Sequence, residues 1–408
     1  MKLLVVSQYF WPENFRLNDL VAEMVRRGHE VTVLTGIPNY PEGQVDPKFR
    51  DNPAAFSEYA GARVVRVPMA ARGSGTLPLL WNYITFVLSA SIAGPWKLRG
   101  ERYDVLFVCQ FSPVTSALPG VLLCWFKRIP MAMWVLDLWP ETLAAVGVVR
   151  SKRVLAVVGL LVSFIYRQCD LILAQSRSFV PVIQTQAGQP KRVKYFPSWA
   201  EAIFDSEASK AAPEVPAAPE SFSVMFAGNI GDAQDFPTIL NAAEILRDQD
   251  IRWLILGDGR AAAWVTEEVK RRQLSDRVLL LGRHPLSRMP AFFRHADALL
   301  VSLKDEPIFA QTIPGKMQTY LATGIPLLAM LNGEGAQVVA ESGAGLVSLA
   351  GNADQLAQSV LELSSMSTEQ LAEMGARGLV TYKREFERGK LMDWLENELI
   401  GLSSSHQS

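Results

Sequence analysis

Short runs of β-branched and aliphatic residues alternate with amphipathic stretches along the first half of the chain. There are seven such runs: Leu3–Val6, Val31–Leu34, Val64–Val67, Val105–Val108, Met131–Val135, Leu171–Ala174 and Val193–Phe196. Between the first two, Asn14–Arg27 places its apolar residues on one helical face and ends at Gly28. Strands separated by single helices predict βαβ units, and their repetition predicts a parallel sheet.

A second series of six runs follows, at Ser223–Ala227, Trp253–Leu256, Val278–Leu281, Ala298–Val301, Leu327–Ala329 and Leu346–Ser348. Beyond Asn352 the pattern is helical and ends with Phe386–Leu399. Between the two series, Glu207–Ser221 (EASKAAPEVPAAPES) holds three prolines and no large apolar residue, which is typical of a linker. We therefore predict an α/β protein with two doubly wound, Rossmann-like domains, at 1–200 and 222–385, joined by a linker at 201–221.

Composition excludes some classes of function. The chain has 40 Lys and Arg against 41 Asp and Glu, so no excess of positive charge indicates nucleic-acid binding. Cys109, Cys124 and Cys169 are scattered among apolar residues, which favours core positions in a reduced cytosol over disulfides. The apolar start of the chain reads as a first strand, because no small-residue cleavage site follows it.

The segment Leu77–Trp96 is uncharged over 20 residues and is followed by Lys97, Arg99 and Arg102. Its length is the minimum for a membrane-spanning helix, but its prolines and polar residues argue against a span. Two further interpretations are open. The segment is either a buried core helix or an apolar surface that lies on a membrane beside anionic headgroups.

Glycine-bearing turns follow three successive strands of the second series. The first comprises Gly228, Asn229, Ile230 and Gly231 with Gln234 close behind, the second contains Gly257 and Gly259, and the third is Gly282–Arg283. Glycine lets the backbone approach a phosphate or a sugar closely. Each turn alone is also compatible with an ordinary strand-to-helix connection, but three at successive strand ends favour a binding edge.

The segment Thr312–Met317 predicts an anion site at the start of a helix. Pro314 and Gly315 leave backbone N–H groups free there, and Lys316 adds a positive charge beside them. This combination suits a diphosphate. The alternative is a solvated lysine on a capped helix.

In the first half, Asp137 and Glu141 follow a predicted strand, where a hydroxyl group of a second substrate, an acceptor, would arrive if each domain holds one of two substrates. A carboxylate in this position can hold or deprotonate that hydroxyl, although either residue could equally cap the next helix. Weaker candidates for acceptor binding are Glu13, Asn14 and Arg16, for which a surface role is the alternative. Asn39 and Tyr40 belong to a segment that reads first as a turn and second as an acceptor loop.

No metal site or cofactor is predicted. Asp248-Gln249-Asp250 has the form of a metal-binding motif, but it lies between a helix and a strand, which favours a solvated turn. The four histidines show no ligand spacing.

Motifs in both halves resemble one family. The segments YFWPENFRLNDL, RGHEVTVLTGIPNYPEG, VLDLWPET, FAGNIGDAQ, LILGDGR and PGKMQTYLATGIPLLA are similar to those of family-4 GT-B glycosyltransferases. The nearest subgroup resembles bacterial polysaccharide enzymes that transfer N-acetyl-L-fucosamine or related amino sugars from UDP. The resemblance implies two Rossmann-like domains facing across a cleft, and a final helix, 386–400, that returns to the first domain.

The resemblance also assigns residues. It implies that Gly228-Asn229-Ile230 faces the donor diphosphate together with Lys316, and that the backbone of Gly282-Arg283 contacts uracil. Two glutamates of the family fall on Gln311 and Thr319, and its usual arginine and lysine fall on Asn229 and Gln234. Neutral groups therefore stand at four positions that are usually charged, and Lys316 and backbone amides must supply more of the positive charge.

We therefore expect a retaining, metal-independent glycosyltransferase that moves a sugar from a UDP-sugar to a lipid-linked saccharide in O-antigen or capsule biosynthesis. We expect it to be cytoplasmic and peripheral at the inner face of the cytoplasmic membrane. Two other classes remain open. A UDP-sugar epimerase of the same fold would act without an acceptor, and a non-catalytic, membrane-associated assembly partner would bind no nucleotide sugar.

Overall fold

The computed structural model describes residues 1–73, 75–145, 149, 151–188, 192–205 and 210–407. Its contacts divide the chain into two compact units. One comprises Met1–Pro197 with Gly389–Ser408, and the other comprises Ser198–Arg388.

The first unit is built on an eight-stranded sheet in the order β3-β4-β2-β1-β5-β6-β7-β8. The strands are β1 Lys2–Val6, β2 Glu30–Thr35, β3 Glu58–Tyr59, β4 Ala62–Arg66, β5 Val105–Gln110, β6 Met131–Val135, β7 Leu171–Ala174 and β8 Arg192–Tyr195. All neighbours pair in parallel except the short edge strand β3. Each predicted strand of the first series overlaps one of these. Strands β5 and β6 are apolar along most of their length and buried throughout, as a sheet covered on both faces requires.

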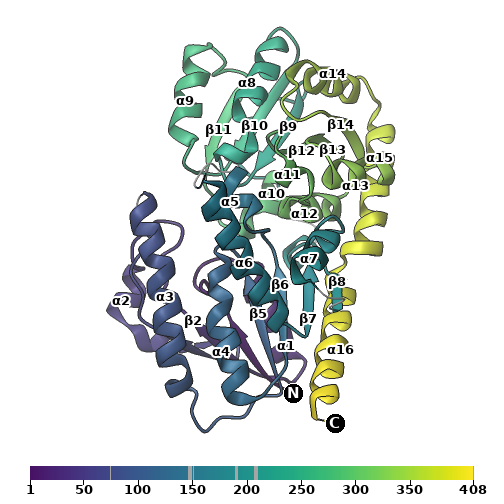
Figure 1. Cartoon of the computed structure of the whole chain (residues 1–408). Coiled ribbons are helices and arrows are strands. Elements are labelled where there is room, and N and C mark those ends of the chain that lie inside the picture. Colours follow the sequence, from purple (N-terminus) through teal and green to yellow (C-terminus); the bar gives the residue numbers. More distant parts are fainter. Residues whose placement is uncertain (74, 146–148, 150, 189–191, 206–209, 408) are drawn as a thin grey trace. The chain divides into compact units, whose positions relative to one another are not determined.

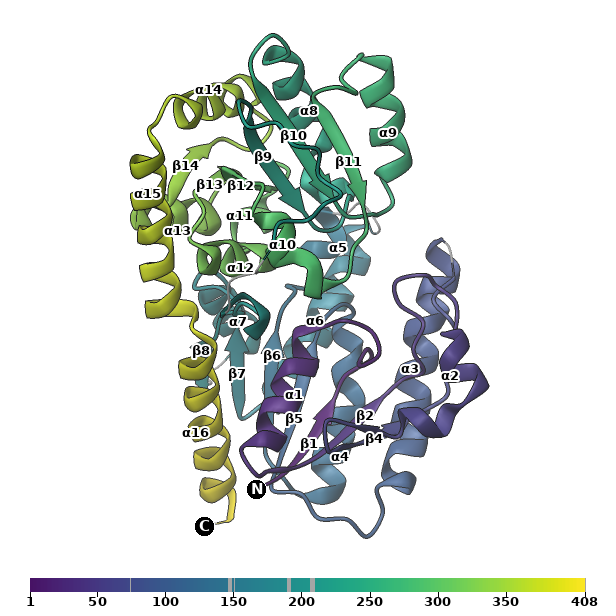
Figure 2. The ribbon, with the colours of Figure 1, turned by 180° about the vertical axis from the view of Figure 1, so that it is seen from behind.

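Helices cover both faces of this sheet. They are α1 Arg16–Arg26, α2 Pro47–Asp51, α3 Thr76–Lys97, α4 Leu118–Lys127, α5 Glu141–Ala145, α6 Lys152–Gln168, α7 Phe179–Ala187 and α16 Arg388–Gln407. Helices α3, α4 and α6 lie side by side on one face (Figure 1), and α1 and α16 lie on the other (Figure 2). On α16, Glu396 and Glu398 form ion pairs with Arg27 and Lys194, so the last helix of the chain packs on the first unit.

The second unit is built on a six-stranded parallel sheet in the order β11-β10-β9-β12-β13-β14. The strands are β9 Phe222–Ala227, β10 Ile251–Leu256, β11 Val278–Gly282, β12 Ala298–Ser302, β13 Leu327–Met330 and β14 Gly345–Ser348. The helices are α8 Phe236–Ile245, α9 Ala262–Arg271, α10 Met289–Phe293, α11 Pro307–Ala310, α12 Gly315–Thr323, α13 Glu334–Ser342, α14 Ala353–Ser364 and α15 Thr368–Thr381. One hydrophobic core lies under α8, α9 and α14, and a second lies under α10, α12 and α13. The predicted pair of doubly wound α/β domains is confirmed.

The segment predicted as a linker packs on the second unit along residues 210–221. Ala212 and Val215 belong to the core under α10 and α12. Ala212 donates a backbone hydrogen bond of 3.0 Å to Ala291, and Glu214 pairs with Arg288. The predicted linker therefore forms part of the surface of the second unit along this stretch. Residues 206–209 lie outside the described part of the chain.

Helix α3 corresponds to the uncharged segment Leu77–Trp96. It is long and apolar enough to cross a membrane by length and composition, yet only 22% of its apolar window is buried. The buried side is a single stripe at four-residue spacing: Asn82, Phe86, Ala90 and Gly94. The interpretation of this segment as a buried core helix is therefore wrong, because it covers the sheet with one stripe and exposes the rest.

Apolar side chains are exposed on all three neighbouring helices α3, α4 and α6. We call this set the apolar face: Leu77, Leu80, Trp81, Ile84, Leu88, Ile92, Trp96, Trp125, Phe126, Val154, Val157, Leu160 and Phe164. The rings of Trp125 and Phe164 meet edge to face with centroids 6.3 Å apart, so the face is continuous from α4 to α6. An exposed apolar area shared by three helices is a feature of surfaces that meet a partner or a membrane.

Candidate functional site

The chain order of the second sheet reverses between β9 and β12. These two strands are neighbours in the sheet, but β10 and β11 lie on one side of the pair and β13 and β14 on the other. In open parallel sheets, ligands bind outside the carboxyl ends of the two strands at such a reversal. The turn after β9 and the start of α12, which follows β12, are therefore the first places to examine.

The three glycine turns predicted from the sequence lie together at this edge. The turn after β9 donates two backbone hydrogen bonds of 2.9 Å, from Gly228 to Leu256 at the end of β10 and from Ile230 to Asp258 in the turn after it. The turn after β10 donates one of 2.8 Å from Gly257 to Gly282, at the end of β11. The turns thus form one continuous edge.

Glycine is required where these turns touch. Gly257 has φ +139°, and a Cβ there would lie 1.8 Å from the carbonyl oxygen of Gly228. A Cβ on Gly259 would lie 2.4 Å from the carbonyl oxygen of Ile230. Since no side chain fits either gap, both glycines have a structural role in bringing the turns together.

Lys316, in the first turn of α12, is the most unusual residue of this edge. Its Nζ lies 3.5 Å from the centre of the Phe226 ring, and a Cβ on Gly228 would lie 3.0 Å from it. The Nζ atom is buried and has no hydrogen-bond partner among the residues that the structure describes. Burial lowers the pKa of Lys316 from 10.5 to about 7. The alternative of a solvated lysine is therefore wrong.

This geometry can hold an anion. A buried ammonium group without a hydrogen-bond partner is costly, and an anion beside it would offset that cost. The start of α12 adds backbone amides and the positive end of the helix dipole, while Gly228, Asn229 and Gly315 are exposed next to it. The site therefore suits a diphosphate that approaches between the first turn and α12.

Two further residues predicted to bind the sugar donor have defined hydrogen-bond partners. The side chain of Gln234 accepts a hydrogen bond of 3.2 Å from the amide of Gly231, and its carbonyl accepts one of 2.7 Å from Ser302, so it fixes the first turn. Thr319 is buried on α12 and donates to a carboxylate oxygen of Glu201 at 3.1 Å. Glu201 was not predicted from the sequence, because a lone glutamate at the start of a predicted linker carries no local signal.

Three candidates line the approach to this edge. Arg283 is exposed after β11, and Gln311 and Pro314 are partly exposed just before α12. The structure thus places every predicted donor residue on the turns at the carboxyl ends of β9, β10 and β11, or on α12 and the segment before it.

The order of the first sheet reverses in the same way, between β1 and β5. Asp137 lies just past β6, the neighbour of β5, and its backbone carbonyl accepts a hydrogen bond of 3.2 Å from the side chain of Gln110 at the end of β5. Its carboxylate accepts hydrogen bonds from the hydroxyl of Thr142 and, at 3.3 Å, from the indole of Trp139. Burial raises the pKa of Asp137, and the hydroxyl and indole groups around it oppose that rise.

Glu141 is the other predicted carboxylate of this edge. It lies in the first turn of α5, and one of its oxygens accepts a hydrogen bond of 3.1 Å from Gln186. The second oxygen is buried and has no hydrogen-bond partner within the described part of the chain.

Glu13 is buried, so the alternative of a surface role is wrong for this residue. One carboxylate oxygen accepts the amides of Asn39 and Tyr40, both at 2.7 Å, and the other accepts the amide of Phe10 at 3.2 Å. Desolvation raises the pKa of Glu13 to about 7 despite these hydrogen bonds. Glu13 therefore fixes the loop that carries Asn39 and Tyr40.

The remaining acceptor candidates differ in exposure. Tyr40 is exposed and Asn14 is exposed, whereas Arg16 is partly exposed at the start of α1. Asn39 is buried, and its side-chain oxygen accepts the amide of Arg72 at 3.0 Å. The segment is thus an ordered loop over the carboxyl edge of the sheet.

A polar cluster that the sequence did not indicate joins these loops to α3. The side-chain oxygen of Asn82 accepts hydrogen bonds from Gln8 at 2.8 Å and from the hydroxyl of Tyr9 at 3.2 Å. Burial raises the pKa of the neighbouring Tyr83, while Arg72 and the Ser112 hydroxyl oppose that rise. Asn82 and Tyr83 could have been noticed as polar groups inside an apolar segment, but only the fold shows that they meet the strand ends.

Among the residues that the structure describes, no group of three or more His, Cys, Asp or Glu side chains could hold a metal ion. The three cysteines are free. Cys109 and Cys169 are buried as predicted, whereas Cys124 is only partly buried.

Comparisons with known families agree with this architecture. Residues 14–199 match the model of a glycosyl transferase 4-like domain, and residues 221–366 match that of glycosyl transferases group 1. WbjE of Pseudomonas aeruginosa, named as a glycosyltransferase, is 26% identical over 66% of this chain and 69% of its own length. WcaI of Escherichia coli K12, named for a glycosyl transferase role in colanic acid biosynthesis, is 24% identical over 79% of this chain and 82% of its own length.

Solved structures show the same fold. The sucrose-phosphate synthase of Thermosynechococcus elongatus superposes with a TM-score of 0.78 at 13% identity, covering 99% of both chains. Alr3699/HepE of Anabaena, solved with UDP and glucose, superposes with a TM-score of 0.69 at 16% identity, covering 98% of this chain and all of that one. The fold and the two family matches together define a glycosyltransferase of the GT-B class. Within that class, the first half of the chain matches a glycosyl transferase 4-like domain and the second half matches a glycosyl transferases group 1 domain.

Proposed function

We propose that this glycosyltransferase uses a UDP-sugar and that its diphosphate is held between the Gly228–Gly231 turn and the start of α12. The observation that carries this proposal is the buried Nζ of Lys316, which lies beside Gly228 without a hydrogen-bond partner among the described residues. As the sugar bond breaks, negative charge grows on the leaving diphosphate. Lys316 and the α12 amides would stabilise that charge, the role that a metal ion has in other enzymes.

The nucleotide and the remaining donor contacts follow from the same edge. Anabaena Alr3699/HepE, which shares the fold, was solved with UDP, and this supports a uridine nucleotide here. The uracil would lie along the backbone of Gly282 and Arg283. The carboxylate of Glu201, hydrogen-bonded to Thr319, would accept the ribose hydroxyls, since positions 311 and 319 are neutral.

We further propose retention of the anomeric configuration and a lipid-linked saccharide acceptor, in O-antigen or capsule biosynthesis. The sugar would be an N-acetylated amino sugar such as N-acetyl-L-fucosamine. The similarity to WcaI, named for colanic acid biosynthesis, supports a polysaccharide pathway, and the motifs of the sequence support the amino sugar. The acceptor hydroxyl would reach Asp137, whose carboxylate is held at a strand end of the first unit.

Thermal shift with a panel of UDP- and GDP-sugars tests the donor, with UDP release measured with and without lipid-linked acceptors. Stabilisation by a UDP-sugar and acceptor-dependent UDP release would support the proposal. Stabilisation without any transfer, with the sugar epimerised instead, would indicate the epimerase. No binding of any nucleotide sugar would indicate a non-catalytic partner.

The pH dependence of donor binding gives a specific prediction. Because the pKa of Lys316 is lowered to about 7, donor binding above this pH must be accompanied by uptake of a proton. We expect the Kd for a UDP-sugar to be constant below pH 7 and to rise above it, by up to roughly tenfold per pH unit. Calorimetry between pH 6 and 9 measures this.

Lys316→Arg is the matched control, because arginine remains charged throughout this range. Its Kd should be independent of pH wherever binding is retained. A wild-type Kd that does not change across the range would contradict the assignment of Lys316 to the diphosphate.

We also propose that the protein is cytoplasmic and binds the inner face of the cytoplasmic membrane through α3. The helix exposes apolar side chains along most of its length, and Lys97, Arg99 and Arg102 are exposed at its end. An apolar surface beside basic residues suits an interface with anionic headgroups. Flotation with anionic liposomes should show binding that weakens with salt. Absence of binding at low salt would exclude the interface, and extraction only by detergent would indicate a spanning helix.

A further inference from the structure

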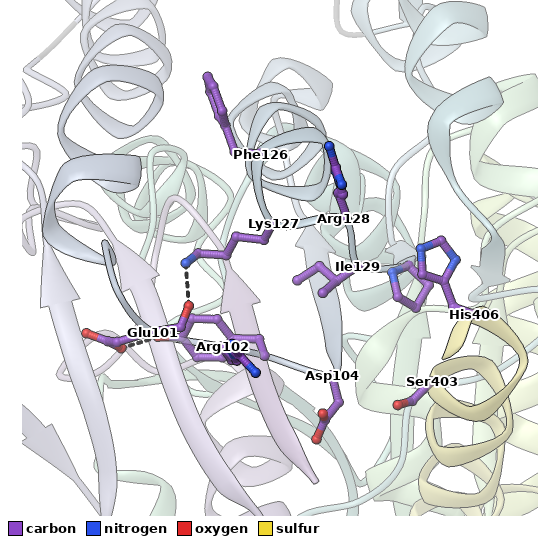
Figure 3. A pocket seen from close by; sticks show the side chains of 11 residues that line it. Glu101, Arg102, Asp104, Phe126, Lys127, Arg128, Ile129, Ser403 and His406 are labelled. Atoms are coloured by element: carbon purple, nitrogen blue, oxygen red, sulfur yellow. Dashed lines mark hydrogen bonds between the residues drawn. The ribbon is translucent and has the colours of Figure 1, made fainter. Parts of the chain in front are cut away.

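A cavity of about 380 Å³ lies in the first unit, at the amino ends of β5 and β6. Its walls are the loop 101–104, residues 126–130 at the end of α4, and Ser403 and His406 of α16 (Figure 3). The amino ends of the strands lie at the opposite edge of the sheet from Asp137, so this cavity is separate from the acceptor end described above. Its volume is within the range of small-molecule sites.

The two acidic residues of the cavity are already engaged. Glu101 accepts hydrogen bonds from Arg63 and from the hydroxyl of Tyr103, both at 2.5 Å. Asp104 accepts the backbone amide of Lys2 at 2.6 Å. Glu101 is thus paired with Arg63, and the basic residues Arg102, Lys127 and Arg128 outnumber the two carboxylates in the lining.

Within the described part of the chain, the basic residues of the cavity form no ion pair with its carboxylates. Lys127 donates to the carbonyl oxygens of Leu98 and Glu101, both at 2.8 Å. Arg102 and Arg128 are exposed at the cavity, and their guanidinium groups form no ion pair or hydrogen bond within the described residues. Two free guanidinium groups at one cavity are suited to a phosphate, because each can donate two parallel hydrogen bonds to its oxygens.

The wall of the cavity continues into the apolar face. Phe126 lines the cavity and is 73% exposed, and Trp125 beside it is 55% exposed. On the adjacent α3, Trp96 is exposed, and the guanidinium group of Arg99 lies 5.0 Å from its ring centre. A ligand phosphate in the cavity would thus lie next to side chains that suit hydrocarbon.

We propose that this cavity binds the phosphate of an anionic phospholipid, while Phe126 and the apolar face enter the acyl region beneath the headgroups. This proposal rests on the proposed membrane association and adds a headgroup site to it. A free phosphate would engage Arg102 and Arg128 but would leave the exposed ring of Phe126 unused. The lipid accounts for both features.

The test compares binding of the full chain to phosphatidylcholine vesicles with and without phosphatidylglycerol, at physiological ionic strength. The variant is Arg102→Gln with Arg128→Gln. The control is Lys48→Gln with Arg50→Gln, which removes the same charge from exposed residues of α2. We expect the cavity variant to lose roughly thirtyfold in affinity for the anionic vesicles, and the control to lose much less.

A second measurement distinguishes a lipid phosphate from free phosphate as the ligand. A third distinguishes loss of the headgroup site from loss of membrane association. Inorganic phosphate alone, at concentrations that keep the ionic strength constant, should not displace the protein from vesicles. Equal losses in the cavity variant and the control, or displacement by inorganic phosphate, would overturn the headgroup site. Failure of the wild-type protein to bind either vesicle would instead overturn membrane association itself. Phe126→Gln should weaken binding to both kinds of vesicle.

Discussion

Replacing Lys316 with alanine is expected to lower the rate of sugar transfer by roughly a hundredfold or more while leaving the fold intact. The reason is the scarcity of positive charge at the proposed diphosphate. Asn229 and Gln234 are neutral, so the ammonium group of Lys316 and the backbone amides must stabilise the leaving group. Steady-state transfer from the UDP-sugar identified by thermal shift measures the loss. Lys270→Ala, on the exposed surface of α9, is the control and should retain full activity.

A second readout separates a functional lysine from a structural one. In the absence of donor, the buried ammonium group disfavours the folded state below pH 7, where the group is protonated both in the folded and in the unfolded chain. This cost falls as the pH rises from about 7 towards 10.5, because the folded state then releases its proton first.

Lys316→Met should therefore raise the melting temperature of the free protein at pH 7 and abolish the shift caused by the donor. A substitution that removes activity but stabilises the free protein is typical of a binding-site residue. If Lys316→Met lowered the melting temperature, or if Lys316→Ala retained transfer, Lys316 would have no role in holding the diphosphate.

The sequence was sufficient to predict the fold because its main determinants are local. Runs such as Met131–Val135 are apolar without alternation, as strands covered on both faces require, and glycines end the helices and form the turns between them. The edge strand β3 was missed because two residues, Glu58 and Tyr59, carry no periodicity. The meeting of the glycine turns at one sheet edge could also be predicted, since each turn lies in a contiguous motif at a strand end.

Contacts between distant residues explain what could not be predicted. The burial of the Lys316 ammonium group depends on Phe226, ninety residues earlier in the chain, and the sequence only showed a lysine at a helix start. Glu201 reaches Thr319 only because the described part of the predicted linker segment packs on the second unit. The exposure of α3 depends on which stripe of the helix faces the sheet, and a helix that is apolar on all sides leaves that choice undetermined.

Replacing Asp137 with asparagine should impair transfer by tenfold or more while the affinity for the nucleotide sugar stays near that of the wild type. Asparagine keeps the size of the side chain and one oxygen that can accept hydrogen bonds from Thr142 or Trp139, but it can neither take up a proton nor carry a charge. The proposed donor residues belong to the second unit, so the donor Kd should not follow the loss of activity. Asp170→Asn is the matched control. This aspartate accepts the amide of Met131 at the other end of β6, and its replacement should leave the ratio of activity to donor affinity unchanged.

The pH profile of transfer distinguishes a reacting carboxylate from one that only positions a loop. Since burial raises the pKa of Asp137, the ionised form that can accept a proton should be lost at a higher pH than for an ordinary aspartate. As the pH is lowered from neutrality, wild-type kcat/KM should therefore decrease at a pH above the usual pKa range of an aspartate. This acidic limb of the profile should disappear in Asp137→Asn.

Glu13, whose pKa is raised to about 7, could give a similar acidic limb, because its protonation would loosen the loop of Asn39 and Tyr40. Glu13→Gln separates the two explanations. If Asp137 is the group that reacts, the acidic limb should persist in Glu13→Gln and disappear only in Asp137→Asn. A limb that persists in Asp137→Asn, or a donor Kd that rises with the loss of activity, would assign Asp137 to structure.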